Sequence, residues 1–362
     1  MAIRDVRAYS SIHARVRALY STMLTPETWE ALIQAQDFDA LLNILSKTVY
    51  GPYLQIERGK LTPRRAVYQI RWHLADIYER LIPLTPEPGQ QLLLQLWRRY
   101  EVDNLKATLR GVETGASWDQ VRHLLCPMTK YITLTTADME KMIHSGDMAR
   151  AIECVRHTPY YGTLVHALER YQEEKTLFPL EVALDLDYHR GLWHSIDQLT
   201  GPDHDHALRV VGTMLDVNNL LWAIRYRVYH HLSEQEIINY TLPLGYQVHD
   251  EDIRAIAAGA DIAQVVRRIY PDAEGLEQLS ERARAGLAAL EVSLQRHIVR
   301  TCHAAFIGYP FHIGVPAAYL LLNEHEVRDL TVLIEAKVSR LPLEMFVSML
   351  ETQVPAYQTE QR

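Results

Sequence analysis

The sequence predicts a nearly all-α protein built from three similar helical units. Apolar residues recur three and four positions apart, which is the spacing of one helix face. No series of alternating apolar and polar segments with hairpin signals indicates a sheet. A short phrase also occurs three times in almost the same form, as EVDNL from Glu101, DVNNL from Asp216 and EVRDL from Glu326. These observations favour a helical unit that has been triplicated.

The first predicted helices come from a phrase that precedes each of these copies. The first copy, PETWEALIQAQDFDALLNIL, begins at Pro26 and acidic Glu27, which is a favourable helix start. Its counterparts are ADMEKMIHSGDMARAIECV and EDIRAIAAGADIAQVVRRI. Aligning Asp37, Asp147 and Asp261 brings the apolar residues of the three phrases into register. Each phrase therefore predicts a short helix, a turn and a second helix.

The thrice-repeated phrase itself predicts a longer helix with an apolar stripe. The stripe residues are Val102, Leu105 and Leu109 in the first copy, Val217, Leu220 and Ile224 in the second, and Val327, Leu330 and Ile334 in the third. Two polar positions three residues apart share a face away from the centre of the stripe. They are Glu101 and Asn104, Asp216 and Asn219, and Glu326 and Asp329.

Two interpretations of these six polar residues stay open. In the first, they make hydrogen-bonded contacts to a neighbouring helix of the same unit. In the second, the three polar faces line a common opening, which we call the stalk socket because of the partner inferred below. Three copies of one face around an axis would suit such a seat.

A third phrase follows each long helix. SWDQVRHLLCP and SEQEIINYTLP both run from a serine to a proline ten positions later, whereas PLEMFVSMLET lacks that final proline. The copies stand roughly 110 to 115 residues apart, which is too long for tetratricopeptide or HEAT repeats. We expect helical units at residues 1–130, 131–246 and 247–362.

Composition limits the classes of function. A formal charge of −8 argues against a general nucleic-acid binder, whose footprint is a basic patch. The three cysteines form no paired spacing and are expected to be reduced, buried thiols. The N-terminal stretch has no apolar signal-peptide core, and the longest apolar stretch, VPAAYLLL, is too short to cross a bilayer. We expect no transmembrane segment.

The main alternative function is a helical metal-dependent hydrolase, suggested by 17 histidines. The densest clusters are DHDH at Asp203 and YHHL at Tyr229, and neither has the spacing of a metal-binding helix motif. DHDH is expected to be a solvated loop and helix start, and His230 and His231 to lie at a helix end. No phosphate-binding loop or nucleophile-elbow motif occurs either. The other alternative is a helical scaffold or adaptor.

The phrases together resemble the C subunit of V-type and A-type ATPases (ATP synthases), which is the homologue of the d subunit of eukaryotic V-ATPases. YSSIHARVRALYSTML at Tyr9 is similar to the opening phrase of that family. The EVDNL and DVNNL phrases resemble its paired repeat motifs, and IGYPFHIGVPAAYLLLNEHEVRDLTVLIEAK resembles its closing segment. Arg328 and Asp329 stand where an Asp-Asn pair is expected, so the third face differs chemically from the other two.

The resemblance implies a funnel of three helical domains around a pseudo-threefold axis. It implies a non-catalytic central-stalk subunit that seats stalk subunits D and F on the proteolipid subunits of the membrane rotor ring. Such a protein transmits torque for ATP-coupled proton or sodium transport, binds no cofactor, and is held by the ring at the cytoplasmic side of the membrane. The coupled ion stays open, because its ligands lie in the ring.

Overall fold

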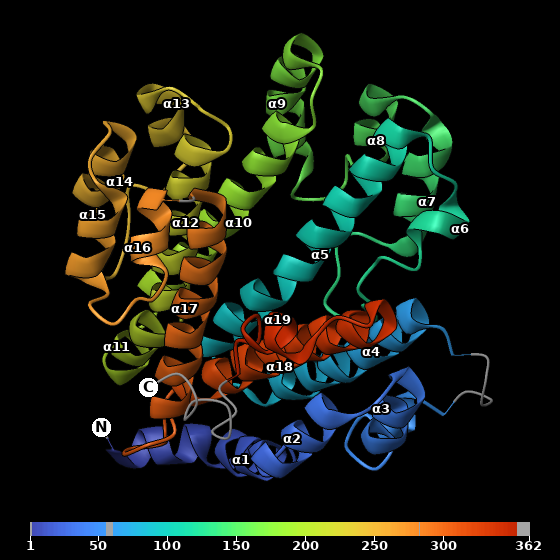
Figure 1. Ribbon diagram of the computed structural model, residues 1–362, viewed down its shortest axis with the longest axis vertical. Coiled ribbons are helices and arrows are strands. Elements are labelled where there is room, and N and C mark those ends of the chain that lie inside the picture. Colours follow the sequence, from blue (N-terminus) through green and yellow to red (C-terminus); the bar gives the residue numbers. More distant parts are fainter. Residues whose placement is uncertain (1, 56–60, 282, 353–362) are drawn as a thin grey trace. The chain divides into compact units, whose positions relative to one another are not determined.

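The computed structural model describes residues 2–55, 61–281 and 283–352, which form helices joined by turns, with no strand among them (Figure 1). The prediction of an all-α fold is confirmed. The chain falls into two compact units, which we describe separately. The terminal unit comprises Met1–Pro63, Leu84–Pro86 and Leu199–Arg362, and the middle unit comprises Arg64–Pro83 and Glu87–Gln198.

The middle unit is organised around one long helix, α5, which packs against α7, α8 and α10. Its apolar stripe is buried, and Trp97 of α5 stacks on Tyr78 of α4 with the ring centroids 4.9 Å apart. The helices are α4 (Pro63–Leu81), α5 (Gly89–Thr114), α6 (Trp118–Val121), α7 (Thr136–Ser145), α8 (Met148–Cys154), α9 (Tyr161–Glu174) and α10 (Phe178–Asp197). A 3-10 turn, η2 (Ile82–Leu84), follows α4.

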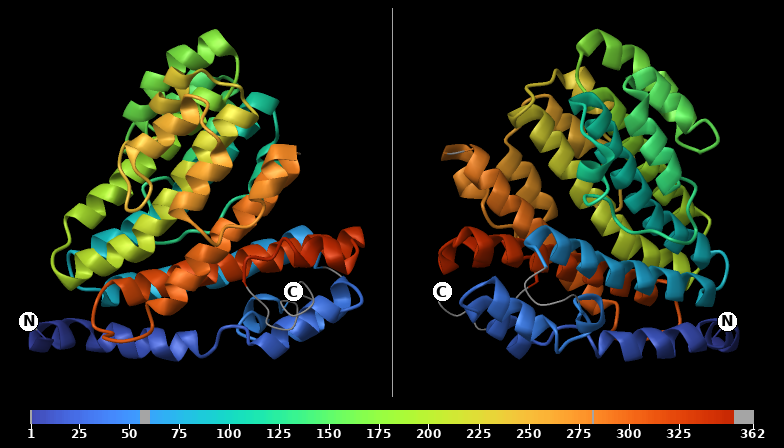
Figure 2. Two further views of the ribbon diagram at one scale, coloured as in Figure 1. Left: turned by 60° about the vertical axis from the view of Figure 1, so that its left-hand side comes forward. Right: turned by 90° about the vertical axis from the view of Figure 1, so that its right-hand side faces the viewer.

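The terminal unit contains α12 and α18, the two other helices that carry the repeated phrase. Helix α18 lies alongside α1 and also contacts α3 and α17 (Figure 2). The N-terminal helices are α1 (Ala2–Tyr20), α2 (Pro26–Gln34) and α3 (Phe38–Leu45), followed by the 3-10 turn η1 (Gly51–Tyr53). The remaining elements are α11 (Pro202–Ala207), the π-helix η3 (Leu208–Gly212), α12 (Thr213–Val228), α13 (Glu234–Asn239), α14 (Asp250–Ala257), α15 (Ile262–Ile269), α16 (Leu276–Glu281), α17 (Ala283–Ala304), α18 (Gly314–Ser339) and α19 (Leu343–Val347).

The three short helix pairs predicted from the sequence are confirmed as α2 with α3, α7 with α8, and α14 with α15. The aligned aspartates Asp37, Asp147 and Asp261 are the N-caps of the second helices. Each carboxylate accepts a hydrogen bond from a backbone N–H in the first turn, at 2.8 to 3.0 Å. This bond satisfies one of the amide groups that a helix start leaves without a partner. The three aspartates that align in the sequence therefore share one structural role, which is to cap the second helix of each pair.

The histidine-rich segment DHDH begins helix α11, so the predicted helix start is confirmed, but its side chains make packing contacts. Asp203 accepts hydrogen bonds from the Tyr9 hydroxyl and the Ile313 backbone N–H, both at 2.8 Å. The ring of His206 stacks on the ring of His312 with centroids 3.5 Å apart. The expectation of a fully solvated loop is therefore wrong for this segment, because Asp203 joins α11 to two other segments of the terminal unit.

The three cysteines are free thiols in the structure. Cys126 and Cys302 are buried free thiols, whereas Cys154 is half-buried, so the expectation of burial fails for one of the three. None of the helices in the described ranges has the length and hydropathy needed to cross a bilayer.

Candidate functional site: three buried polar contacts

All six polar residues of the repeated phrase are buried in the structure. They lie on α5, α12 and α18, the long helices that the sequence predicts. Their exposed fractions are 1% for Glu101, 4% for Asn104, 1% for Asp216, 3% for Asn219, 2% for Glu326 and 0% for Asp329. A buried polar group is costly unless it is hydrogen-bonded, so the partners of these side chains define what they do.

In the first copy, Glu101 of α5 holds the loop that enters α7. Its carboxylate accepts hydrogen bonds from the backbone N–H groups of Thr133 and Leu134, the latter at 3.0 Å. It also accepts one from the hydroxyl of Tyr160, which follows α8, at 2.6 Å. One carboxylate therefore fixes both ends of the α7–α8 pair to the long helix.

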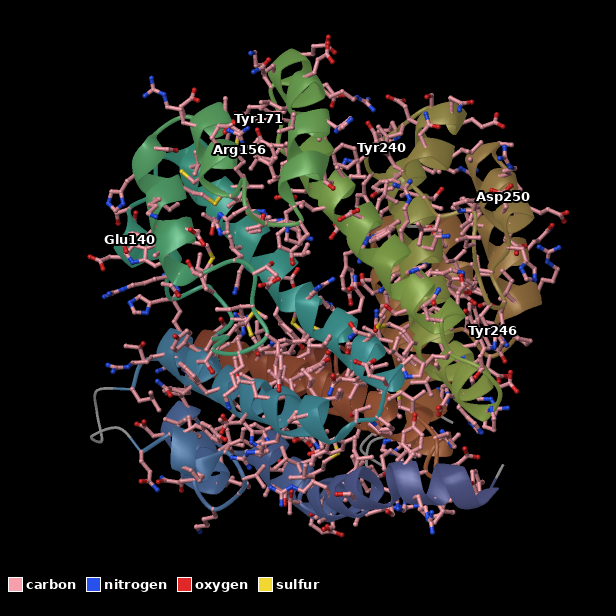
Figure 3. The ribbon with its side chains drawn as sticks, turned by 180° about the vertical axis from the view of Figure 1, so that it is seen from behind. Glu140, Arg156, Tyr171, Tyr240, Tyr246 and Asp250 are labelled. Carbon is pink, nitrogen blue, oxygen red and sulfur yellow. The ribbon has the colours of Figure 1, made fainter. Side chains whose placement is uncertain are left out.

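In the second copy, Asp216 of α12 holds the corresponding loop before α14. Its carboxylate accepts hydrogen bonds from the backbone N–H groups of Tyr246, Gln247 and Val248 at 2.8, 2.5 and 3.1 Å. Figure 3 labels Tyr246, which marks this loop, and Asp250, at which α14 begins. The loop can curl around the carboxylate because residue 245 is glycine, where a Cβ atom would lie 1.8 Å from the Val248 carbonyl oxygen.

In the third copy, Glu326 of α18 holds a helix pair from the opposite end of the chain. Its carboxylate accepts hydrogen bonds from the Leu24 backbone N–H at 3.0 Å and from the Tyr50 hydroxyl at 2.7 Å. Leu24 precedes α2, and Tyr50 follows α3. The pair α2–α3 is thus bound to α18 in the way that α7–α8 is bound to α5. Thus α7–α8 is bound to α5, α14–α15 to α12, and α2–α3 to α18. In the first two cases the helix pair follows its long helix along the chain, whereas the N-terminal pair α2–α3 is bound to the C-terminal helix α18.

The second polar position holds the segment that follows the long helix. The side-chain amide of Asn104 donates to the carbonyl of Cys126 at 2.9 Å and accepts from its N–H at 2.6 Å. Asn219 makes the same pair of bonds with Leu242, at 2.9 and 2.8 Å. Both loop residues precede the prolines that end the third repeated phrase, Pro127 and Pro243. An amide side chain suits this position because it can both donate and accept.

The missing proline of the third copy is explained by the residue that replaces asparagine. Asp329 can only accept when ionised, and it accepts from the backbone N–H groups of Glu351 at 2.9 Å and Thr352 at 2.7 Å. Thr352 occupies the position of Pro127 and Pro243, and a proline there would have no N–H to donate. The change to aspartate and the loss of the proline are therefore one coupled change.

A charged cluster surrounds this third contact. Arg328 Nη1 lies 3.0 Å from a carboxylate oxygen of Glu351, and His325 Nδ1 lies 2.5 Å from the same carboxylate. Burial alone would raise the pKa of Glu351, but the hydrogen bond from His325 and the charge of Arg328 lower it to about 2. The departure Arg328-Asp329 thus replaces a neutral contact by an ionic one.

The net pKa shift has the opposite direction for three acidic residues of the repeated phrase, for which burial outweighs the hydrogen bonds. Burial raises the pKa of Asp216 to about 6, although the N–H groups of its loop favour the ionised form. It raises the pKa of Glu326 to about 7 against the bonds from Tyr50 and Leu24, and that of Asp329 to about 7 against the donors of residues 351 and 352. Taking a carboxylate out of water disfavours its charge, and these bonds compensate only in part.

The six side chains hold loops and helix pairs against the long helices. The carboxylate and amide groups of the six residues are engaged by hydrogen bonds within their own compact unit. Across the described parts of the chain, no cluster of three or more histidine, cysteine, aspartate or glutamate side chains has a geometry that could hold a metal ion.

Sequence reasoning missed the two tyrosines that complete these contacts, Tyr50 and Tyr160. They follow the second helix of a pair by a few residues, in the turn phrases YGPY and TPYYG, and Tyr270 directly follows α15 in the turn phrase YPDAEG. The phrases were recognisable as turns from their proline and glycine residues. The shared tyrosine was the available signal, but its partner lies on another helix and only the folded chain reveals it.

Comparison with known proteins assigns the chain to a family. The family model for the ATP synthase (C/AC39) subunit matches residues 12–347. The C subunit of the A-type ATP synthase of Methanocaldococcus jannaschii is 24% identical over 356 residues, covering 96% of this chain and 87% of the relative. The corresponding A-type ATP synthase protein of Archaeoglobus fulgidus is 24% identical over 349 residues, covering 93% of this chain and 94% of the relative. Because the match runs through all three long helices and their buried polar residues, the protein belongs to the ATP synthase (C/AC39) subunit family.

Proposed function

We propose that the protein is the non-catalytic central-stalk subunit that seats the stalk of a rotary ATP synthase on its membrane rotor ring. The observation that carries this proposal is the family match over residues 12–347. In this role the protein receives stalk subunits D and F, rests on the proteolipid subunits of the ring at the cytoplasmic side of the membrane, and transmits torque for ATP-coupled proton or sodium transport.

The buried contacts supply a property that torque transmission needs. A coupling protein has to transmit force without local opening, and the least stable parts of a protein open first. Here each short helix pair is tied to a long helix by a buried carboxylate, and buried, satisfied hydrogen bonds make a structure stiff and specific. The bonds of Glu326 to Leu24 and Tyr50 also tie the two ends of the chain together.

We assign the six polar residues of the repeated phrase to this internal role. The alternative, in which they line a stalk socket, predicts that their side chains reach a partner. Their burial and their internal hydrogen bonds support the first interpretation. Under it, the three contacts are equivalent parts of a triplicated unit, arranged around a pseudo-threefold axis as in the funnel that the family resemblance implies.

Binding to the recombinant D–F stalk pair tests the function and the two interpretations together. We expect the wild-type protein to bind the pair. Asn104→Lys combined with Asn219→Lys should lower the thermal midpoint strongly, because a buried lysine without a partner is costly. Asn239→Lys, at an exposed helix position, is the matched control and should alter stability by no more than about 0.5 kcal/mol.

Three outcomes separate the interpretations. A lowered midpoint of the double lysine variant supports the internal role. An unchanged midpoint with loss of stalk binding supports the socket and contradicts our assignment of the six residues. Failure of the folded wild-type protein to bind either the stalk pair or the isolated ring contradicts the proposed function itself.

A further inference from the structure

The second of the three buried contacts is incomplete. The hydroxyls of Tyr160 and Tyr50 donate to Glu101 and Glu326, at 2.6 and 2.7 Å. Tyr270 directly follows α15, nine residues after Asp261, whereas Tyr50 and Tyr160 each lie 13 residues after their aligned aspartates; the side chain of Tyr270 is 4% exposed. Its hydroxyl has no hydrogen-bond partner among the described residues. A buried hydroxyl without a partner costs free energy, so this position is expected to have an occupant that the protein does not supply.

The second copy differs in two respects: its tyrosine directly follows the helix pair, and its carboxylate side chain is shorter. The second copy has Asp216 where the other two have glutamate, and aspartate is shorter by one methylene group. Both Asp216 oxygens are taken by backbone N–H groups of the loop 246–248. The carboxylate therefore holds the loop but does not reach Tyr270, which leaves vacant the position of the oxygen that the other tyrosines bind.

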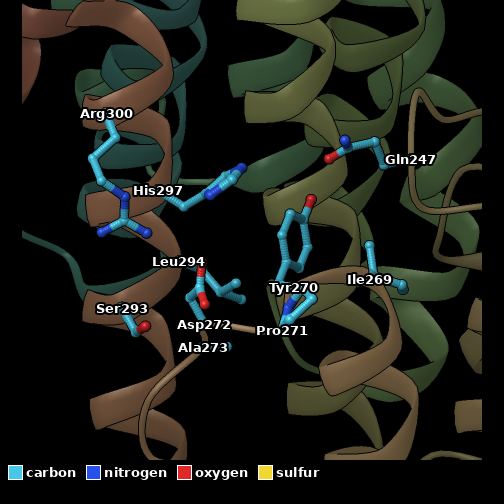
Figure 4. Close-up of a pocket in the computed structure, with 10 residues that line it drawn as sticks. All are labelled: Gln247, Ile269, Tyr270, Pro271, Asp272, Ala273, Ser293, Leu294, His297 and Arg300. Atoms are coloured by element: carbon cyan, nitrogen blue, oxygen red, sulfur yellow. The ribbon is translucent and has the colours of Figure 1, made fainter. Parts of the chain in front are cut away.

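Tyr270 is among the residues that line a cavity of about 80 Å³. One water molecule needs roughly 10–15 Å³ of such space, so the cavity has room for a group several times larger. It is lined by residues of the α15–α16 connection and one face of α17, together with Gln247. Figure 4 shows the Tyr270 hydroxyl pointing to the side on which Gln247 and His297 lie, with Arg300 one helical turn beyond His297.

The polar lining consists mainly of hydrogen-bond donors. Arg300 is exposed and forms no ion pair within the described part of the chain, and His297 is half-buried. The hydroxyl of Ser293 accepts from the Glu274 N–H, which leaves its own proton free to donate. Asp272 is the one carboxylate among the lining residues that the structure describes. Guanidinium, hydroxyl and imidazole donors thus occur in one lining, and such donors are those that carboxylates and phosphates prefer.

We propose that this cavity binds a small oxyanion of the phosphate or carboxylate type, one oxygen of which accepts the hydrogen bond of Tyr270. The oxyanion thus takes the place that the Glu101 and Glu326 side chains fill in the other two contacts. Arg300 supplies the positive charge that opposes Asp272 and Asp216, whereas His297, whose pKa burial lowers, acts as a neutral hydrogen-bond donor. The inference concerns the isolated chain and does not depend on the proposed function.

Thermal denaturation with increasing inorganic phosphate, at ionic strength held constant with chloride, tests the proposal. A ligand that binds only the folded state raises the midpoint with its concentration. We expect such a rise for the wild-type protein, and a loss of affinity of about tenfold or more in Arg300→Gln and Tyr270→Phe. Arg267→Gln, which removes an exposed charge on α15 away from the cavity lining, should respond like the wild type.

Asp216→Glu provides a second and independent test. The longer side chain should reach Tyr270, supply the missing carboxylate oxygen and make the midpoint insensitive to phosphate. Acetate in a parallel series distinguishes a carboxylate site from a phosphate site. The proposal is wrong if phosphate and acetate both leave the wild-type midpoint where chloride leaves it, which means that water alone fills the cavity. It is equally wrong if all variants respond alike.

Discussion

At the scale of single residues, the side chain at the second polar position is related to the residues of the loop that it binds. Asn104 and Asn219 bind both backbone groups of a residue that precedes proline, whereas Asp329 binds two N–H groups in succession. Aspartate and proline are incompatible at these paired positions, because an ionised carboxylate needs the N–H that proline lacks.

This coupling predicts that Asn219→Asp is strongly destabilising. One oxygen of the new carboxylate would keep the N–H of Leu242, but the other would face the Leu242 carbonyl, and Pro243 offers it no N–H. Leaving a buried charge without its partner typically costs about 3–5 kcal/mol of unfolding free energy. Urea denaturation measures this loss, with Asn239→Asp as the same chemical change at an exposed helix position. A loss no larger than that of the control would show that the amide contact is not needed.

The raised pKa values predict the pH dependence of the Glu326 contact. An acid whose pKa is raised on folding binds more protons in the folded state, so its stabilising effect is full below its unfolded pKa and is lost as the pH rises. For Glu326, with a pKa of about 7, the loss extends from about pH 4.5 to 7. Relative to the wild type, Glu326→Gln should therefore become progressively more stable across this interval.

Thermal midpoints of both proteins between pH 4.5 and 8 provide the measurement. Glu351, whose pKa is lowered to about 2, loses its stabilising effect only below that interval and does not interfere. A constant difference between the two midpoints would show that Glu326 does not titrate in this range.

At the scale of elements, the short helix pairs were predictable and their partners were not. Periodicity and the aligned aspartates predict α2–α3, α7–α8 and α14–α15, because caps and apolar spacing are local properties of the chain. The repeated phrase likewise identifies Glu101, Asp216 and Glu326 as equivalent. Nothing local, however, indicates that α2–α3 binds α18, from which it is separated by most of the chain. The tyrosine partners were missed for the same reason.

The loop around Asp216 depends on a glycine, which gives a prediction for one element. A Cβ atom at residue 245 would lie 1.8 Å from the Val248 carbonyl oxygen and 2.8 Å from the nearer Asp216 carboxylate oxygen. Because the first of these atoms belongs to the backbone, the loop would have to open. We expect Gly245→Ala to lower the unfolding free energy by about 2 kcal/mol or more, as large single-residue effects do.

Gly162→Ala is the matched control for this substitution. A Cβ atom at residue 162 meets nothing within 4 Å, and the residue lies in the first turn of α9. Alanine has a higher helix propensity than glycine, so the control substitution should be neutral or should stabilise the protein by up to about 1 kcal/mol. Equal denaturation midpoints for the two alanine variants would contradict the close approach at residue 245.

At the scale of the whole molecule, the pairing of helices predicts where each carboxylate acts. In hydrogen-exchange mass spectrometry, Glu326→Ala should raise exchange in residues 24–50, because it releases α2–α3 from α18. Glu101→Ala is the counterpart and should raise exchange in residues 133–160 instead. Local opening follows the loss of the contacts that hold a segment. If both variants raised exchange in the same segments, the assignment of each helix pair to its own long helix would be wrong.

The most direct test of the central claim is to remove the protein from its complex and measure coupling. Membrane vesicles from a strain that lacks the gene are compared with vesicles from the strain that carries it, for ATP hydrolysis and for ATP-driven uptake of protons and of sodium. If the protein couples the two processes without chemistry of its own, ATP hydrolysis should persist in vesicles that lack it, and ion uptake should be lost. Supplying the wild-type chain should restore ion uptake. Undiminished ion uptake without the protein would contradict the claim that it transmits torque.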